Sequence, residues 1–360
     1  MSTSTDGSSV RIGGLVPLTR PGWVEAGRHL LAGLELGVRE INEAGGIGGR
    51  ALALVVRDTA ADPERAAAAV TELAESGVVA IAGEYHSVVA RAAATRADAL
   101  GLPFLCSSAV LDSLTEQPTE WVARLAPAQS RGWQTYADFL LGAGHTRIAV
   151  AAAPSVYWAA GVGILRDYLA PRGGTVIELR ALDPADVCDE LVDNHATVLL
   201  LLVGTPEPAV PLVQVVRRDP RLADLLIGAP AGQPEFAEWS RLLGDDGAAI
   251  PFLRYLPERL TPLGARVETA LRERLTEAPS FVAFEGYDTI AVLADLLRAH
   301  GVDRGRIAES WCRVAVEGTR GQIQFSRTPD IGVWQWVWPP VQVVDRDPSD
   351  PGRFRILHSR

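Results

Sequence analysis

Along the first 110 positions, short runs of apolar residues alternate with longer amphipathic stretches. The runs predict buried strands, and the stretches predict helices. One helix is expected to stop at Gly45 and Gly46, and another to begin at Asp62 with Pro63 in its first turn. The expected strands cover residues 11–18, 51–58, 78–83 and 103–108, and the expected helices cover residues 24–46, 62–76 and 87–100. Nearly continuous apolar strands joined by helices predict a parallel sheet that is covered on both faces.

The same alternation starts again after residue 127 and predicts a second α/β unit. Its expected strands cover residues 147–153, 175–182, 197–204 and 225–230, and its expected helices cover residues 129–142, 158–170, 184–194 and 207–218. A strand over 248–255 and helices over 259–275 and 281–300 follow. These two helices have no strands of their own, so we expect them to return to the first sheet.

Three tryptophans alternate in a strand-like segment near the C-terminus: Trp334, Trp336 and Trp338. Because side chains of a strand alternate between its two faces, this spacing predicts that all three lie on one face of a sheet.

Composition narrows the range of functions. With 360 residues, 48% of them hydrophobic and 22% charged, the chain is expected to form two globular domains. The formal net charge of −10 argues against a nucleic-acid partner, which needs a basic surface. The chain contains no lysine, which excludes a Schiff base and a P-loop lysine. The three cysteines, Cys106, Cys188 and Cys312, are interpreted as buried thiols.

No apolar run is long enough for a membrane span, and residues 1–14 lack the apolar region of a signal peptide. As written, the sequence is expected to be that of a cytoplasmic protein that does not insert into a membrane. If an export signal lies upstream of residue 1, the expectation changes to an extracytoplasmic protein.

Motifs for catalysis and cofactor binding are missing. The chain has no HExxH, GxSxG, P-loop or EF-hand pattern, and its six histidines do not have the spacing of metal ligands. The glycine-rich residues 45–50 follow a helix and precede a strand, which is the reverse of a dinucleotide-binding loop. We therefore expect no catalytic residue, no metal site and no cofactor.

Several segments resemble the type I periplasmic binding proteins of the leucine/isoleucine/valine-binding and amide-sensing branch. They include "GGLVPLTRPGWVEAG", "INEAGGIGGR", "GVVAIAGEYHS", "LPFLCSSA" and "FVAFEGYDTIAVLADLLRAHG". The resemblance covers nearly the whole chain and is weaker from about 200 to 260. It implies an α/β fold of two Rossmann-like lobes joined by three crossover segments, with the ligand cleft between the lobes. The implied N-terminal lobe comprises residues 10–124 and 254–326, and the C-terminal lobe comprises residues 125–253 and 327–360.

The resemblance also implies a set of ligand-binding residues. Ser87 matches a serine at a helix start that holds a ligand carboxylate together with backbone N–H groups. A structural alternative is that Ser87 only caps its own helix. The remaining first-lobe positions are a clamp after the fourth strand and three side chains near the cleft: Ser107, Ser108, Ala109, Val110, Trp23, Tyr85 and His86. Val110 replaces the Thr or Ser that is frequent at its position. Tyr157 and Thr205 are the expected second-lobe contacts.

One departure from the pattern concerns the ligand. The amino-acid binders of this family carry an acidic residue in the loop that here reads Ala229, Pro230, Ala231. A buried ammonium without a counter-charge costs several kcal/mol. Either another acid takes this place, the candidates being Glu25, Glu84 and Glu285, or the ligand has no α-ammonium group.

The expected function is therefore non-catalytic binding of a small polar ligand, amino-acid-like, carboxylate or amide, with an apolar or aromatic tail. The protein would deliver it to the permease of an ABC transporter, and binding would close the two lobes about a hinge. The alternative is a cytoplasmic ligand sensor on the same fold that acts through a regulatory protein. An enzyme that recruited the fold ranks last. Ser87→Ala is expected to weaken binding and to leave the melting temperature of the free protein unchanged.

Overall fold

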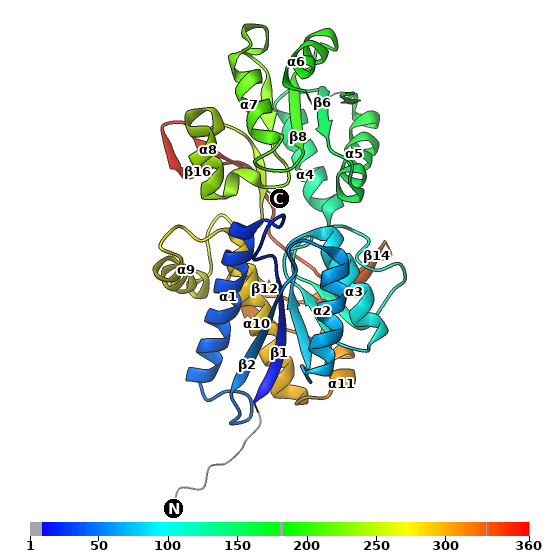
Figure 1. The fold of residues 1–360 in the computed structure, drawn as a ribbon, viewed down its shortest axis with the longest axis vertical. Coiled ribbons are helices and arrows are strands. Elements are labelled where there is room, and N and C mark those ends of the chain that lie inside the picture. The colour runs from blue at the N-terminus through cyan, green and yellow to red at the C-terminus, as the bar shows by residue number, and fades with distance from the viewer. Residues whose placement is uncertain (1–8, 181–182, 329, 360) are drawn as a thin grey trace, which may run out of the picture. The chain divides into compact units, whose positions relative to one another are not determined.

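The computed structural model describes residues 9–180, 183–328 and 330–359 (Figure 1). The chain divides into two compact units. Unit 1 comprises Met1–Ala128 and Arg259–Pro339, and unit 2 comprises Gln129–Glu258 and Pro340–Arg360. The chain thus passes between the units three times, in agreement with the type I fold.

The third passage lies later than expected. The sequence placed residues 327–339 in the C-terminal lobe, and this assignment is wrong. Strand β14 (Ile331–Trp336) pairs with β5 (Val122–Arg124) in the sheet of unit 1, so the chain leaves that unit only after Pro339.

Unit 1 is built on a seven-stranded sheet with the order β13-β14-β5-β4-β3-β1-β2. Its strands other than β13 run parallel, and β13 is antiparallel to β14. The strands not yet given are β1 (Val10–Val16), β2 (Leu52–Asp58), β3 (Ala80–Gly83), β4 (Phe104–Cys106) and β13 (Phe325–Thr328). The parallel strands expected within the first 110 residues are confirmed.

Helices cover both faces of this sheet (Figure 1). The α-helices of unit 1 are α1 (Val24–Glu43), α2 (Pro63–Glu75), α3 (Ser87–Ala99), α9 (Pro262–Leu275), α10 (Phe281–His300) and α11 (Arg304–Ala308). Helices α2 and α3 bury Leu73 and Val89 in a core with Ile81 and Phe104 of the sheet. Asp62 accepts a hydrogen bond from Arg65 N, which confirms the expected N-cap of α2. Short strands β11 (Val316–Gly318) and β12 (Gly321–Ile323) form a separate hairpin.

The two helices without strands of their own do return to unit 1, where α10 packs closely along α1 (Figure 1). Glycines make this contact. A Cβ added to Gly33 would lie 1.9 Å from the carbonyl oxygen of Ala283, and one added to Gly286 would lie 2.5 Å from that of Leu30. The backbones therefore approach too closely for any side chain at these positions.

Unit 2 contains a parallel sheet with the order β7-β6-β8-β9 and an antiparallel sheet with the order β10-β15-β16. The strands are β6 (Arg147–Ala152), β7 (Thr175–Glu178), β8 (Val198–Leu202), β9 (Leu226–Gly228), β10 (Phe252–Arg254), β15 (Gln342–Asp347) and β16 (Asp350–Ser359). The helices are α4 (Gln129–Gly142), α5 (Val156–Leu169), α6 (Pro184–Asp193), α7 (Ala209–Arg218) and α8 (Ala237–Leu243). The expected strand over 175–182 ends at Glu178, and residues 181–182 lie outside the described part of the chain.

Two smaller predictions are wrong. Strand β14 ends at Trp336, which is buried, whereas Trp338 lies beyond it and is 74% exposed. Trp338 therefore does not share a sheet face with the other tryptophans. Cys312 is exposed, while Cys106 and Cys188 are buried as expected. Within the described residues, no helix combines the length and the apolar character that crossing a membrane requires.

The glycine contact between α1 and α10 can be tested by Gly33→Ala. The added methyl group must push two helix backbones apart, and overpacking of this kind costs about 1–3 kcal/mol of unfolding free energy. Gly163→Ala in α5 is the matched control, because outside the residue, its chain neighbours and the adjacent helix backbone no heavy atom of the described residues lies within 4 Å of the added Cβ. It should be neutral or stabilise by up to about 1 kcal/mol. Urea unfolding followed by circular dichroism measures the unfolding free energy of both variants. Equal effects of the two substitutions would contradict the close backbone contact at Gly33.

Candidate ligand-binding site

Loops that follow β1, β2, β3 and β4 meet at one edge of the unit 1 sheet, because these strands are parallel neighbours. Ligands of open α/β sheets bind beyond the carboxyl ends of the strands. The loop after β3 carries residues 84–87, and the loop after β4 carries residues 107–111. The first-lobe residues expected from the sequence therefore gather at this edge.

Glu84 organises the loop after β3. Its side chain is fully buried, and Oε2 accepts a hydrogen bond from Thr59 Oγ1 at 2.8 Å. Oε1 accepts the backbone N–H groups of Tyr85 at 2.8 Å and His86 at 2.9 Å. The carboxylate is thus used inside the protein, which argues against its role as the substitute acid for a ligand ammonium.

His86 and its aromatic neighbours connect this loop to the start of α1. The backbone N–H of Trp23 donates to His86 Nε2 at 3.4 Å, so Nδ1 carries the proton and faces Glu84 Oε1 at 3.3 Å. The rings of Trp23 and Tyr85 meet edge to face, with centroids 5.8 Å apart. All three side chains are half-buried, which leaves part of their aromatic surface for contact with a ligand.

Ser87 has a structural role that the sequence did not predict. It is the first residue of α3, and His86 occupies the N-cap position. Ser87 Oγ accepts the N–H groups of Val110 and Leu111, each at 3.2 Å. The cap alternative is therefore wrong. Because both lone pairs of Oγ are occupied, the hydroxyl can offer only its hydrogen, and its further partner must be a hydrogen-bond acceptor.

Two features beside Ser87 favour an anion. The N-cap residue His86 makes no side-chain capping hydrogen bond, and the Glu84 carboxylate accepts the N–H of His86 itself. The N–H groups of the first turn of α3 thus have no side-chain partner among the described residues. Behind the second loop, the buried Arg124 donates to the carbonyl oxygens of Val110 and Leu111 and to Gln335 Oε1. Burial raises the pKa of the nearby Cys106 thiol to about 11, and the positive charge of Arg124 acts against this rise.

The loop after β4, where the sequence predicts a ligand clamp, is buried. Ser107 N donates to the carbonyl oxygen of Gly83, which joins the two loops, and Ser107 and Ser108 hydroxyls are 3.1 Å apart. Ala109 and Val110 are buried, and Val110 brings no hydroxyl to the site. Ser108 remains 4% exposed.

Tyr157 and Thr205 lie in unit 2 and are described there by themselves. Tyr157 is in the first turn of α5, where its ring packs edge to face on Trp133 with centroids 6.1 Å apart. Thr205 follows β8, and its buried Oγ1 makes no hydrogen bond to the described residues. The loop with Ala229 follows β9. Ligand contacts by Tyr157 and Thr205 remain predictions.

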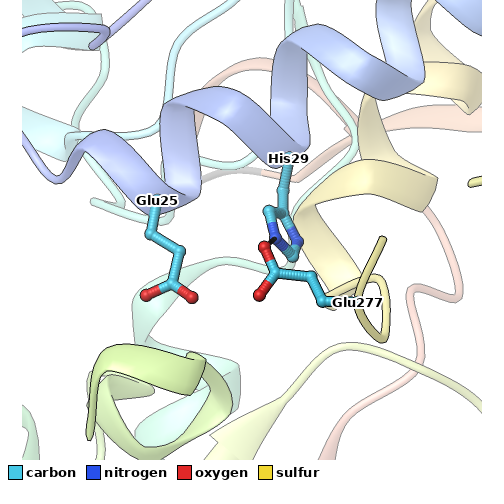
Figure 2. Close-up of side chains that lie close together, drawn as sticks. All are labelled: Glu25, His29 and Glu277. Atoms are coloured by element: carbon cyan, nitrogen blue, oxygen red, sulfur yellow. Dashed lines mark hydrogen bonds and ion pairs between the residues drawn. The ribbon is translucent and has the colours of Figure 1, made fainter. Parts of the chain in front are cut away.

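One group of described residues brings three metal-ligand atoms within 4.8 Å of one another: Glu25, His29 and Glu277 (Figure 2). Figure 2 shows Glu25 and His29 side by side on α1, with Glu277 facing His29. Glu277 also pairs with Arg28. The sequence predicted no metal site, so this cluster needs a separate test.

Hydrogen bonding decides against a metal ligand at His29. Its Nδ1 accepts the backbone N–H of Ser280 at 2.9 Å, so the proton of the neutral ring is on Nε2, which contacts Glu277 Oε1 at 3.2 Å. A metal would need the lone pair of Nε2 and an Nδ1–H donor, the reverse arrangement. We interpret the cluster as a polar connection between α1 and the start of α10.

This interpretation predicts a pH effect on stability. Burial lowers the pKa of His29, although Glu277 and Glu25 act in the opposite direction and Arg28 adds to the lowering. The unfolded chain therefore takes up a proton first, and unfolding free energy should fall as pH drops below about 6.5. His29→Asn, whose amide oxygen can accept the Ser280 N–H, should lessen this fall. Urea unfolding between pH 5 and 8 measures it. A rise in melting temperature with zinc in the wild type, absent from the variant, would favour a metal site instead.

Comparison with known proteins gives one family. A family model described as periplasmic binding protein matches residues 9–335. A leucine binding protein from Thermotoga maritima has a similar structure, with a TM-score of 0.82, 21% identity, and coverage of 96% of this chain and 97% of that chain. A solute binding protein from Rhodopseudomonas palustris HaA2 in complex with p-hydroxybenzoic acid gives a TM-score of 0.81 at 16% identity, covering 98% of this chain and 97% of that chain. At these identities the likeness shows the fold.

Sequence similarity to curated proteins is local. A Leu/Ile/Val-binding protein homolog 7 of Brucella melitensis is 31% identical over 120 residues, which are 33% of this chain and 30% of that protein. The chain therefore matches about a third of the length of this relative.

Proposed function

Since the chain belongs to the periplasmic binding protein family, we propose that it is a non-catalytic receptor for a small carboxylate. The receptor delivers this ligand to the permease of an ABC transporter. The observation that carries the proposal is the Ser87 hydroxyl, which has only a hydrogen to offer because Oγ already accepts two backbone N–H groups. A carboxylate oxygen beside the first turn of α3, whose N-cap residue His86 makes no side-chain capping bond, is the acceptor that this arrangement stabilises best.

The ligand proposed for this site lacks an α-ammonium group. Ala229, Pro230 and Ala231 provide no counter-charge, and Glu84 is engaged by Thr59 and by its own loop. Glu285 pairs with Arg320 inside unit 1. Half-buried Trp23 and Tyr85 favour an apolar or aromatic tail. The structural neighbour from Rhodopseudomonas palustris, which holds p-hydroxybenzoic acid, provides an example of this ligand class on the same fold.

Transport requires the protein to work outside the cytoplasmic membrane. An export signal encoded upstream of Met1 is the observation that tests this. A cytoplasmic sensor would use the same ligand site and a regulatory protein as partner. Stimulation of a reconstituted permease by the liganded protein separates the two roles. In either role the ligand is recovered chemically unchanged.

The first prediction of the proposal concerns ligand choice. Isothermal titration calorimetry should show that benzoate or 4-hydroxybenzoate binds at least tenfold more tightly than leucine. The physical reason is that an unpaired buried ammonium costs several kcal/mol, and each 1.4 kcal/mol is a factor of ten in affinity. Tighter binding of leucine would contradict the proposal and would point to Glu25 as the substitute acid.

The second prediction concerns Ser87→Ala. Loss of a charge-assisted hydrogen bond worth about 1.5–3 kcal/mol should weaken benzoate binding at least tenfold. The same change leaves the N–H groups of Val110 and Leu111 without their acceptor, so the free protein should lose about 1–3 kcal/mol of stability. This revises the expectation from the sequence of an unchanged melting temperature.

Thr95→Ala is the matched control, because Thr95 is exposed on the same helix and its hydroxyl bonds only locally, to Arg91 O. The benzoate affinity and the unfolding free energy of this variant should both remain close to the wild-type values. Unchanged benzoate affinity in a folded Ser87→Ala variant would mean that Ser87 serves only to hold the loop after β4.

A further inference from the structure

Unit 1 encloses a group of three charged side chains that the proposed ligand site does not use. Glu285 and Asp288 belong to α10, and Arg320 lies in the turn between β11 and β12. All three side chains are fully buried. Arg320 Nη1 is 3.1 Å from Glu285 Oε1, and Arg320 Nε is 2.9 Å from Asp288 Oδ2. Two carboxylates thus share one guanidinium, so one extra negative charge would be buried if both were ionised.

The two carboxylates are not equally stabilised. Asp288 receives a further hydrogen bond from the backbone N–H of Thr319, at 2.7 Å. Glu285 Oε2 makes no hydrogen bond of good geometry to the described residues. Burial raises the pKa of Glu285 to about 7, while Arg320 and the nearby Ser108 hydroxyl act to lower it. Burial also raises the pKa of Asp288. The proton of this group therefore belongs on Glu285.

Arg320 and Asp288 are the charged groups that act on Glu285. The other elements packed against α10 are α1, α9, α11, β3, β4 and β11. Titratable groups on these elements or directly beside them contact other partners or solvent; they include His29, Glu40, Arg266, Glu277, Glu84, Cys106, Arg304 and Glu317.

Ser108 connects this group to the ligand site. Its hydroxyl lies near Glu285 on one side, and on the other it donates to the Ser107 hydroxyl at 3.1 Å, in the loop after β4. A serine hydroxyl has one hydrogen to donate. If Glu285 is ionised, that hydrogen is drawn to its carboxylate. If Glu285 is protonated, Glu285 can donate to Ser108 Oγ, and the hydrogen of Ser108 becomes available to another acceptor.

Resting on the proposed function, we propose that Glu285 is a positioning residue that takes up a proton when a carboxylate ligand binds. The protonated side chain turns the Ser108 hydroxyl away from Glu285 and toward the ligand. A carboxylate arriving beside Ser87 adds negative charge to the same region, which further favours the neutral form of Glu285. The site therefore selects acceptor ligands, and more strongly at low pH.

Linkage fixes the sign of the effect. A ligand that binds with uptake of one proton loses affinity as pH rises above the range in which the free protein is already protonated. The dissociation constant of benzoate should be flat below about pH 6. It should rise toward tenfold per pH unit above the pKa of Glu285, which is about 7. Benzoate itself stays ionised throughout, so the change reports the protein.

The experiment is calorimetric titration of the wild type with benzoate and with 4-hydroxybenzoate from pH 6 to 8.5. It is done in two buffers of different ionisation enthalpy, which gives the number of protons taken up. That number should be near zero at pH 6 and approach one at pH 8.5. This measurement needs no variant and decides the proposal even if the variants below do not fold.

Glu285→Gln places an amide where the protonated acid would be, with an oxygen for Arg320 and an N–H for Ser108. Its dissociation constant should be independent of pH and close to the wild-type value at pH 6, with no proton uptake. Asp288→Asn is the matched control, since Asp288 shares Arg320. It should keep the proton uptake, with a midpoint at lower pH, because Arg320 then compensates Glu285 alone.

Three outcomes would overturn the proposal. Binding with no proton uptake and a flat dissociation constant would leave the proposed function standing and remove the role of Glu285. An unchanged pH dependence in a folded Glu285→Gln variant would assign the proton to another group. Failure of both carboxylates to bind would overturn the proposed function together with this inference.

Discussion

The candidate site depends on one pair of hydrogen bonds, from the N–H groups of Val110 and Leu111 to the Ser87 hydroxyl oxygen. They join the start of α3 to the loop after β4 and fix the distance between the two loops. They also remove both acceptor positions of the hydroxyl, which leaves a donor. The same contact therefore holds the loops together and determines the polarity that the site presents to a ligand.

Support for these hydrogen bonds comes from distant parts of the chain. Arg124 holds the carbonyl oxygens of Val110 and Leu111 and is itself held by Gln335 of β14. The hairpin of β13 and β14, added to the sheet by the last residues of unit 1, thus supports a loop more than 200 positions earlier in the chain. Glu285, from the returning helix α10, lies beside Ser108 of the same loop.

Local patterns were sufficient to predict the strands β1–β4, the cap at Asp62 and the polar loop before Ser87, because each depends on neighbouring residues. Partners of Ser87 and Arg124 were not predictable, since residues 23 and 211 positions apart form these contacts. The predictions of the third boundary between the units and of the position of Trp338 were wrong for a related reason. The pairing of β14 with β5 joins distant segments of the chain and cannot be read from the sequence of either strand alone.

The central claim is that Ser87 donates its hydrogen to a carboxylate of the ligand. A crystal structure of the protein with 4-hydroxybenzoate tests it most directly. The account predicts a carboxylate oxygen about 2.5–2.7 Å from Ser87 Oγ. The N–H groups of Val110 and Leu111 should still donate their hydrogen bonds to Ser87 Oγ. A ligand whose carboxylate lies elsewhere, or one that directs a donor group at Ser87 Oγ, would contradict the account.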